Sequence, residues 1–196
     1  MNPGEMNKRI TVKEAVTSSE GVIWADAGRP WAKVTEGKEG LIAAYAVKSE
    51  AIEITARETD ITPANAVLFR DENYLVTSVL REGEHPVYLK IKAAKGKVHT
   101  LHVFRPVKGK NDFGATVWET EEIMQTVGCI AEKYVNHSSE TGHDETETEL
   151  ILVTPKLTVL QEGDSIEEDG DSFKVVAAYL TDEYKNQYRL RRAKDN

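Results

Sequence analysis

The sequence predicts a mainly β protein that consists of two tandem small β-barrel domains, over residues 1–96 and 97–196. Short segments in which apolar and polar residues alternate occur in both halves, and this period is typical of half-buried strands. Turn residues separate these segments at short intervals, as in small all-β domains. In addition, one β-hairpin pattern occurs twice. The alternation predicts the fold class, and the repeat predicts two domains.

The repeated hairpin pattern spans residues 65–80 and 164–179. Each copy has an apolar residue, a turn rich in Asp, Glu, Asn or Gly, and then an aromatic residue that begins an apolar run, which is typical of strand, tight turn and strand. Equivalent residues lie 99 positions apart in three pairs (166 − 67, 173 − 74 and 175 − 76). A constant offset indicates a duplicated domain. We expect it to hold without gaps from residues 51–95 to residues 150–194.

The first half contains one segment that departs from the strand period. Strands are predicted where apolar and polar residues alternate, at residues 7–13, 22–24, 31–34, 52–55, 65–80 (a hairpin) and 87–92. Between them, Leu41, Ala44, Tyr45 and Lys48 follow helical spacing, and three alanines between residues 39 and 50 favour a helix. We therefore expect one short α-helix inserted into the first barrel.

The second half aligns with the first but has longer connections. Leu101 and Val103 lie 91 positions after Ile10 and Val12, whereas residues 128–131 align with residues 29–32 at an offset of 99. The first loop of the second copy is therefore longer. Residues 136–149 are strongly acidic and almost free of apolar residues. Such a segment buries too little surface to offset its ordering entropy, so we expect a mobile loop unless a partner holds it.

Composition excludes several classes of protein. The net charge of −8 argues against general nucleic-acid binding, because phosphate contacts need clustered Lys and Arg. No apolar run approaches the ~20 residues of a membrane helix, and the N-terminus lacks the apolar core of a signal peptide. A single cysteine, Cys129, allows no intramolecular disulfide and fits a reducing cytoplasm.

Residues that could carry chemistry are few, and each has a simpler interpretation. A metal site could be drawn from His137, His143, Asp144 and Glu147, but their spacing matches no metal motif, and a solvated loop is favoured. His99 and His102 are three apart on a predicted strand and therefore lie on opposite faces. Cys129 has apolar neighbours typical of a core residue. The sequence therefore predicts neither an enzyme nor a bound cofactor or metal.

The C-terminal end is basic and carries Arg189, Arg191 and Arg192. These arginines could contact phosphate. However, the repeat aligns this segment with residues 89–95, an ordinary strand with a charged outer face. We therefore favour a strand whose arginines meet the acidic surface of a partner protein.

The order of short motifs in residues 1–95 resembles the head-tail joining (head-closure, or stopper) proteins of tailed bacteriophages. The residues that carry the resemblance are Gly4, Arg9-Ile-Thr-Val12, Gly21, Trp24, Trp31-Ala-Lys-Val34, Ile54-Thr-Ala-Arg57 and Tyr74-Leu-Val76. The second half resembles the family more weakly, through Gly114, Trp118, Cys129-Ile-Ala131 and Phe173-Lys-Val175. It has Pro155-Lys156 in place of Ala56-Arg57, so a role of Arg57 does not transfer to the second half.

The resemblance implies a structural virion protein of the phage neck, made in the cytoplasm of the host bacterium. In that family, identical subunits form a ring, with twelve-fold symmetry, that closes the DNA-filled head below the portal and adaptor proteins. The ring connects the head to tail terminator or tail proteins, and the genome passes through it without specific binding or membrane contact. The alternatives are a tail-completion or neck protein of an adjacent ring, or a cytoplasmic two-barrel module that binds a peptide or small ligand.

We expect the contact residues to lie where the copies differ. The candidates for an oligomer or partner interface are Leu41, Ile42, Tyr45, Lys48, Arg57, Arg189, Arg191 and Arg192. One short helix would expose more apolar surface than an isolated barrel should.

Truncation of Leu41, Ile42 and Tyr45 to alanine should therefore block assembly and leave the monomer folded. Circular dichroism of the purified variant and its amount in particles would measure the two effects. Normal incorporation of the triple variant into particles would contradict the interface.

Overall fold

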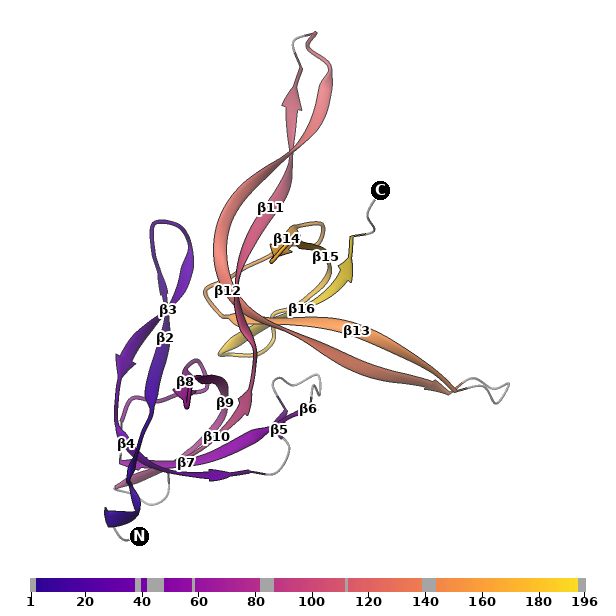
Figure 1. Ribbon diagram of the computed structural model, residues 1–196. Coiled ribbons are helices and arrows are strands. Elements are labelled where there is room, and N and C mark those ends of the chain that lie inside the picture. Colours follow the sequence, from indigo (N-terminus) through magenta and orange to yellow (C-terminus); the bar gives the residue numbers. More distant parts are fainter. Residues whose placement is uncertain are drawn as a thin grey trace. The chain divides into compact units, whose positions relative to one another are not determined.

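The structure, a computed structural model, describes residues 3–37, 40–41, 48–57, 59–81, 87–111, 113–138 and 144–193. These residues are almost entirely β-strand, as the sequence predicts (Figure 1). The chain divides into two compact units. The first comprises residues 1–16, 24–98 and 182–185, and the second comprises residues 17–23, 99–181 and 186–196.

The first sheet has eight strands in the spatial order β1-β4-β7-β10-β9-β8-β2-β3 and is an open, curled half-barrel rather than the closed barrel that the sequence predicts. A short 3-10 turn, Pro3–Glu5, precedes it. The strands are β1 (Lys8–Arg9), β2 (Thr11–Thr17), β3 (Val22–Gly28), β4 (Trp31–Glu36), β7 (Ala51–Arg57), β8 (Ala66–Phe69), β9 (Glu72–Arg81) and β10 (Tyr88–Lys95).

The core of the first unit follows from strand alternation. On β7, Ile52, Ile54 and Ala56 are buried, and the residues between them are more exposed. Ile54 lies opposite Val34 on β4 and opposite Ile91 on β10. Apolar residues therefore form continuous rows across the sheet, and these rows remove the inner face from water.

The predicted helix is wrong for the part of residues 39–50 that the structure describes. Gly40–Leu41 (β5) and Lys48–Ser49 (β6) form a small antiparallel pair, with Leu41 opposite Lys48. Residues 42–47 lie outside the described residues. Gly40 is a poor helix former, and helical spacing over so few positions is a weak signal beside cross-strand hydrogen bonds. No α-helix occurs among the described residues.

The second unit contains a closed barrel with the strand order β11-β12-β13-β16-β15-β14. Its interior is filled by apolar side chains from every strand. Gly128 lies at a point of close packing, because a Cβ atom there would be 2.6 Å from Leu152 Cδ1 and 2.9 Å from Leu101 Cδ1. The strands are β11 (Val98–Lys110), β12 (Thr116–Ser138), β13 (Asp144–Pro155), β14 (Ser165–Glu168), β15 (Asp171–Tyr179) and β16 (Lys185–Arg192).

Strand β12 takes part in two long hairpins that extend beyond the barrel (Figure 1). Its first half follows β11 after a turn at residues 111–115, where Asn111 Oδ1 accepts from the backbone N–H groups of Phe113 and Ala115. Its second half pairs with β13 from Cys129 opposite Val153 to Ser138 opposite Asp144. The described parts of both hairpins therefore lead away from the barrel (Figure 1).

The acidic segment 136–149 differs from the predicted loop. Residues 136–138 and 144–149 are paired strand residues, and residues 139–143 lie outside the described part. Thr146 and Thr148 alternate with glutamates here, and β-branched residues favour extended backbone. Cross-strand pairing can thus order a segment that has too few apolar residues to form a core.

Corresponding strands of the two units pair in equivalent registers. Val12 lies opposite Val67, and Val103 lies opposite Ile166, which gives the predicted offsets of 91 (103 − 12) and 99 (166 − 67). Both hairpin turns have positive φ angles, at Arg70 and Asp71 and at Asp169 and Gly170, as type I′ turns require. The following strands each skip one residue in their pairing, at Thr77 and at Val176 (176 − 77 = 99).

The gapless alignment fails at the last strand. Val76 lies opposite Ala93, whereas Val175 lies opposite Leu190, so the offset is 97 on this strand (190 − 93). The connection before β16 is two residues shorter than the one before β10. Arg189 is therefore equivalent to Lys92 and not to Lys90, as the sequence alignment predicted.

A turn fixed by one polar side chain precedes the hairpin in each unit. Asn65 Oδ1 accepts from the Thr62 N–H (2.8 Å), and Asp164 Oδ2 accepts from the Gln161 N–H (2.8 Å), again 99 positions apart. The same side chain makes a further contact that differs between the units. Asn65 Nδ2 donates to the Lys13 carbonyl on β2, whereas the Asp164 carboxylate accepts from Arg105 on β11.

The Arg105 guanidinium donates through Nε and Nη2 to the two carboxylate oxygens of Asp164, at 2.7 and 2.8 Å. Asp164 is 1% exposed. The bidentate hydrogen bond raises the pKa of Arg105 above its ordinary value, and the guanidinium stays charged. The buried carboxylate is therefore satisfied by a cation and by the turn backbone, and it ties β11 to the hairpin.

Replacing Asp164 by alanine removes the acceptor of three N–H groups. The free energy of unfolding should fall by about 2–3 kcal/mol, measured by urea denaturation, because Arg105 and the Gln161 N–H lose a charged partner. Arg105→Ala and the double variant complete a double-mutant cycle. Simple addition of the two single effects would show that the ion pair does not couple the turn to β11.

Candidate interaction site

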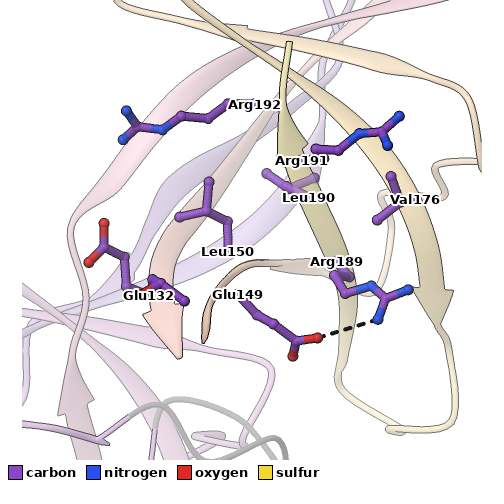
Figure 2. A pocket seen from close by; sticks show the side chains of 9 residues that line it. Glu132, Glu149, Leu150, Val176, Arg189, Leu190, Arg191 and Arg192 are labelled. Atoms are coloured by element: carbon purple, nitrogen blue, oxygen red, sulfur yellow. Dashed lines mark hydrogen bonds and ion pairs between the residues drawn. The ribbon is translucent and has the colours of Figure 1, made fainter. Parts of the chain in front are cut away.

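A groove on the second unit is lined by residues from four strands and has a volume of about 700 Å³. Figure 2 shows the residues that line it. They are Glu132 on β12; Thr148, Glu149 and Leu150 on β13; Val176 on β15; and Arg189, Leu190, Arg191 and Arg192 on β16. This volume accommodates several side chains of a bound segment.

The groove combines apolar and charged residues because side chains alternate along its strands. Leu190 belongs to the barrel core, and Leu150 packs against that core. Neighbouring residues on β16 point to opposite faces, and in Figure 2 Arg192 extends on the opposite side of the strand from Arg189. The leucines therefore supply an apolar floor that is flanked by arginines on both sides.

The charges in the groove are unevenly compensated. Arg189 Nη1 lies 3.3 Å from Glu149 Oε1, and the same carboxylate lies 3.9 Å from Lys133 Nζ. Arg191 and Arg192 are exposed, and no described residue forms a recorded hydrogen bond or ion pair with their side chains. A second acidic residue, Glu132, also lines the groove. In a chain of net charge −8, this groove therefore gathers three arginines in one place.

The structure brings together only part of the predicted interface. Arg189, Arg191 and Arg192 lie together on β16. Arg57 ends β7 in the first unit and is exposed. Leu41 and Lys48 are opposite each other in the β5–β6 pair, but their side chains, like all of Ile42 and Tyr45, lie outside the described residues.

A second exposed feature is the aromatic tip of the β11–β12 hairpin, defined by Phe113 and Trp118. Phe113 is 94% exposed and Trp118 is 66% exposed. Lys108 Nζ lies 5.2 Å from the centroid of the Trp118 ring, within range of a cation–π interaction. Aromatic side chains are enriched at protein interfaces. Neither residue was predicted to be an interface candidate, although the aromatic residue in the turn Asn111-Asp-Phe-Gly114 was a usable signal.

The two histidines of β11 bind different carboxylates. His99 Nδ1 contacts Glu168, and His102 Nδ1 lies 2.8 Å from Glu122 Oε1. His99, Glu168 and Asp169 offer potential metal ligands within 4.8 Å of one another. However, the direct contact of His99 Nδ1 with Glu168 occupies the ring nitrogen that faces the carboxylates. This arrangement is explained by an ordinary side-chain contact.

The other candidates for chemistry are the residues of the acidic segment and Cys129. The side chains of His137, Asp144 and Glu147, and all of His143, lie outside the described residues. Cys129 is buried opposite Val153 and packs as an apolar residue. Within the described residues, no helix has the length and apolar character needed to cross a membrane.

The strand order and the closed six-stranded sheet define the class of the chain as a small β-barrel protein. Comparison with protein families identifies the N-terminal half: residues 1–96 match the model of phage head completion proteins, and this half belongs to that family. The family supports a structural role in closing the phage head and makes the chain a virion component. Neither the curated proteins nor the solved structures gave a match.

The aromatic tip yields a prediction about assembly. Replacement of Phe113 and Trp118 by serine should change the free energy of unfolding by less than about 0.5 kcal/mol, because both side chains are exposed. The yield of complete particles should fall, because a partner loses two aromatic anchors. Leu157→Ser, at another exposed apolar residue of the same unit, is the matched control. Particle yields equal to those of the control would show that the tip has no partner.

Proposed function

We propose that the protein forms a homo-oligomeric ring in the phage neck, which closes the DNA-filled head below the portal and adaptor proteins and connects it to the tail. The observation that carries this proposal is the match of residues 1–96 to phage head completion proteins. Completion of a filled head requires a component that binds at the DNA entrance and leaves a surface for the next component.

The physical properties of the chain support this role. The β-sheet cores provide stable scaffolds from which loops and hairpins reach other subunits. The net charge of −8 opposes strong binding of phosphate, so DNA can pass a ring of these subunits without being held. The groove arginines are few and lie beside acidic residues, which fits a protein partner better than a nucleic acid.

The second unit supports a role in attachment. Apart from residues 17–23, it lies outside the 96 residues that match the family, and it carries both the groove and the aromatic tip. These surfaces have different chemistry: one is cationic with an apolar floor, and the other is aromatic. Two such surfaces suit two different contacts, one with a neighbouring subunit and one with an adaptor or tail protein.

A phage that lacks this gene, complemented from a plasmid, tests the proposal. Without complementation, we expect heads that package DNA but lose it, together with separate tails. With complementation, cryo-electron microscopy of particles should place a ring of the chain between the portal complex and the tail. Tailed, DNA-filled particles in the absence of the protein would contradict head closure. A ring found only at the far end of the tail tube would assign it to tail completion instead.

A further inference from the structure

We propose that the β11–β12 arm of one copy pairs, edge to edge, with the same arm of the next copy. The arm is defined as residues 105–110 of β11 and residues 116–124 of β12, which extend beyond the strand pairing of the barrel (Figure 1). This inference rests on the proposed ring and identifies backbone pairing as the contact that links its subunits.

Each strand of the arm has one edge that no described strand covers. The pairing of β11 with β14 runs from His102 to Phe104, and the pairing of β12 with β13 begins at Cys129. The nearest other backbone contact on β12 is at Gln125, just beyond the arm, where the N–H donates to the Glu20 carbonyl. An uncovered edge presents a row of N–H and C=O groups and is a template for another strand.

The turn of the arm determines which backbone groups point outward. The Asn111 N–H donates to the Ala115 carbonyl at 3.0 Å, within the hairpin. Backbone groups alternate in direction along an antiparallel strand, so those of Lys108 and Lys110 point to the uncovered side of β11. Those of Trp118 point to the uncovered side of β12, and the contact of the Trp118 ring with Lys108 agrees with this register. Both edges therefore offer donors and acceptors to a further strand.

The arm obtains little stability from its own two strands. A two-stranded ribbon is marginally stable in water, and a third strand adds stability. Trp118 is 66% exposed and Ile123 is 39% exposed, so the arm also leaves apolar side chains in water. A further strand on each side would satisfy the outward backbone groups and cover part of this apolar surface.

Charge decides which edges can pair. The charged residues in the β12 part of the arm are acidic and exposed: Glu119, Glu121 and Glu122. In the β11 part, Asp164 holds Arg105, and the other charged residues are two exposed lysines, Lys108 and Lys110. Two edges of the same kind would bring like charges together in any register, which is destabilising. A β11 edge beside a β12 edge brings opposite charges together.

Pairing between unlike edges is heterologous. Each copy offers its β11 edge to one neighbour and its β12 edge to the other, and the contact repeats from copy to copy until a ring closes. Because β11 and β12 run in opposite directions, arms that point the same way pair in antiparallel fashion, as the two strands do within one arm. A two-fold dimer would need two like edges, which their charges oppose. The contact is therefore of the kind that a ring requires.

Pro106 and the two lysines also restrict which strands can pair with the β11 edge. Pro106 has no N–H group, so the edge lacks one donor near the barrel. Proline and lysine on an edge oppose non-specific strand addition. The lysines still attract an acidic strand, and the β12 edge is the acidic strand that the next copy supplies.

Charge reversal tests the contact in the complemented phage. One variant carries Lys108→Glu and Lys110→Glu, and the other carries Glu119→Lys and Glu121→Lys. Each should lower the number of copies per particle and the infectious titre by about tenfold or more, because like charges then meet where unlike edges pair. The chain that carries all four substitutions should recover most of the loss, since the attraction returns with exchanged signs.

Hydrogen exchange tests the backbone pairing itself. In the purified wild-type monomer, the outward amides of Lys108 and Lys110 should exchange quickly, because no strand covers them. In assembled particles the same amides should exchange more slowly by about tenfold or more, because the next arm accepts their hydrogen bonds. Equal exchange in the two states would overturn the edge pairing.

The control variant exchanges two exposed charges of the same unit outside the arm, Glu162→Lys and Lys174→Glu, and should assemble normally. Thermal unfolding of each purified variant establishes that the barrel is intact. Normal assembly of either edge variant would overturn the contact and leave the proposed ring standing. Loss in both variants without recovery in the combined chain would also overturn it, in favour of separate partners. Absence of a wild-type ring from particles would instead contradict the proposed function, and the contact with it.

Discussion

Each unit depends on one buried polar side chain that fixes the turn before its hairpin. Asn65 and Asp164 occupy equivalent positions and accept a backbone N–H three residues earlier at the same distance, 2.8 Å. A buried amide or carboxylate has to satisfy its remaining hydrogen-bonding capacity. Asn65 does so by donating to β2, and Asp164 does so by accepting from Arg105 on β11. In both units this requirement attaches the hairpin to the unit's first long strand, β2 or β11. It thereby supports the pairing of that strand with the first strand of the hairpin, β8 or β14.

Because the two scaffolds share these constraints, the differences between them concentrate in the connections. The second unit lengthens β11, β12 and β13 into hairpins that leave the barrel, and it shortens the connection before β16 by two residues. The lengthened hairpins carry the aromatic tip and the acidic N-terminal part of β13. Strand β16, whose alignment with β10 is shifted by two residues, carries the three groove arginines. A barrel closed by backbone pairing tolerates such changes, because its core contacts lie at the inner ends of the same strands.

Secondary structure was predictable where it follows from a local sequence pattern. It was not predictable where it depends on pairing with a distant strand. The hairpins at residues 65–80 and 164–179 follow from alternation and turn chemistry, and their offsets of 91 and 99 recur in the registers. The helix over residues 39–50 was wrong at Gly40, Leu41, Lys48 and Ser49, because pairing across β5 and β6 outweighs a weak helical period. The acidic segment was predicted to be a loop, because pairing with β12 is not encoded in its own composition.

For the candidate site, the sequence by itself determined that Arg189, Arg191 and Arg192 lie on a strand, and that the segment before Leu150 is acidic. It also determined the resemblance of the N-terminal half to head-closure proteins, which the family comparison confirms. Only the tertiary structure decided that Glu132, Leu150 and Val176 join these arginines in one groove. Those residues come from strands up to about sixty positions away in the sequence, and only barrel closure, a long-range pairing with no local signal, brings them together.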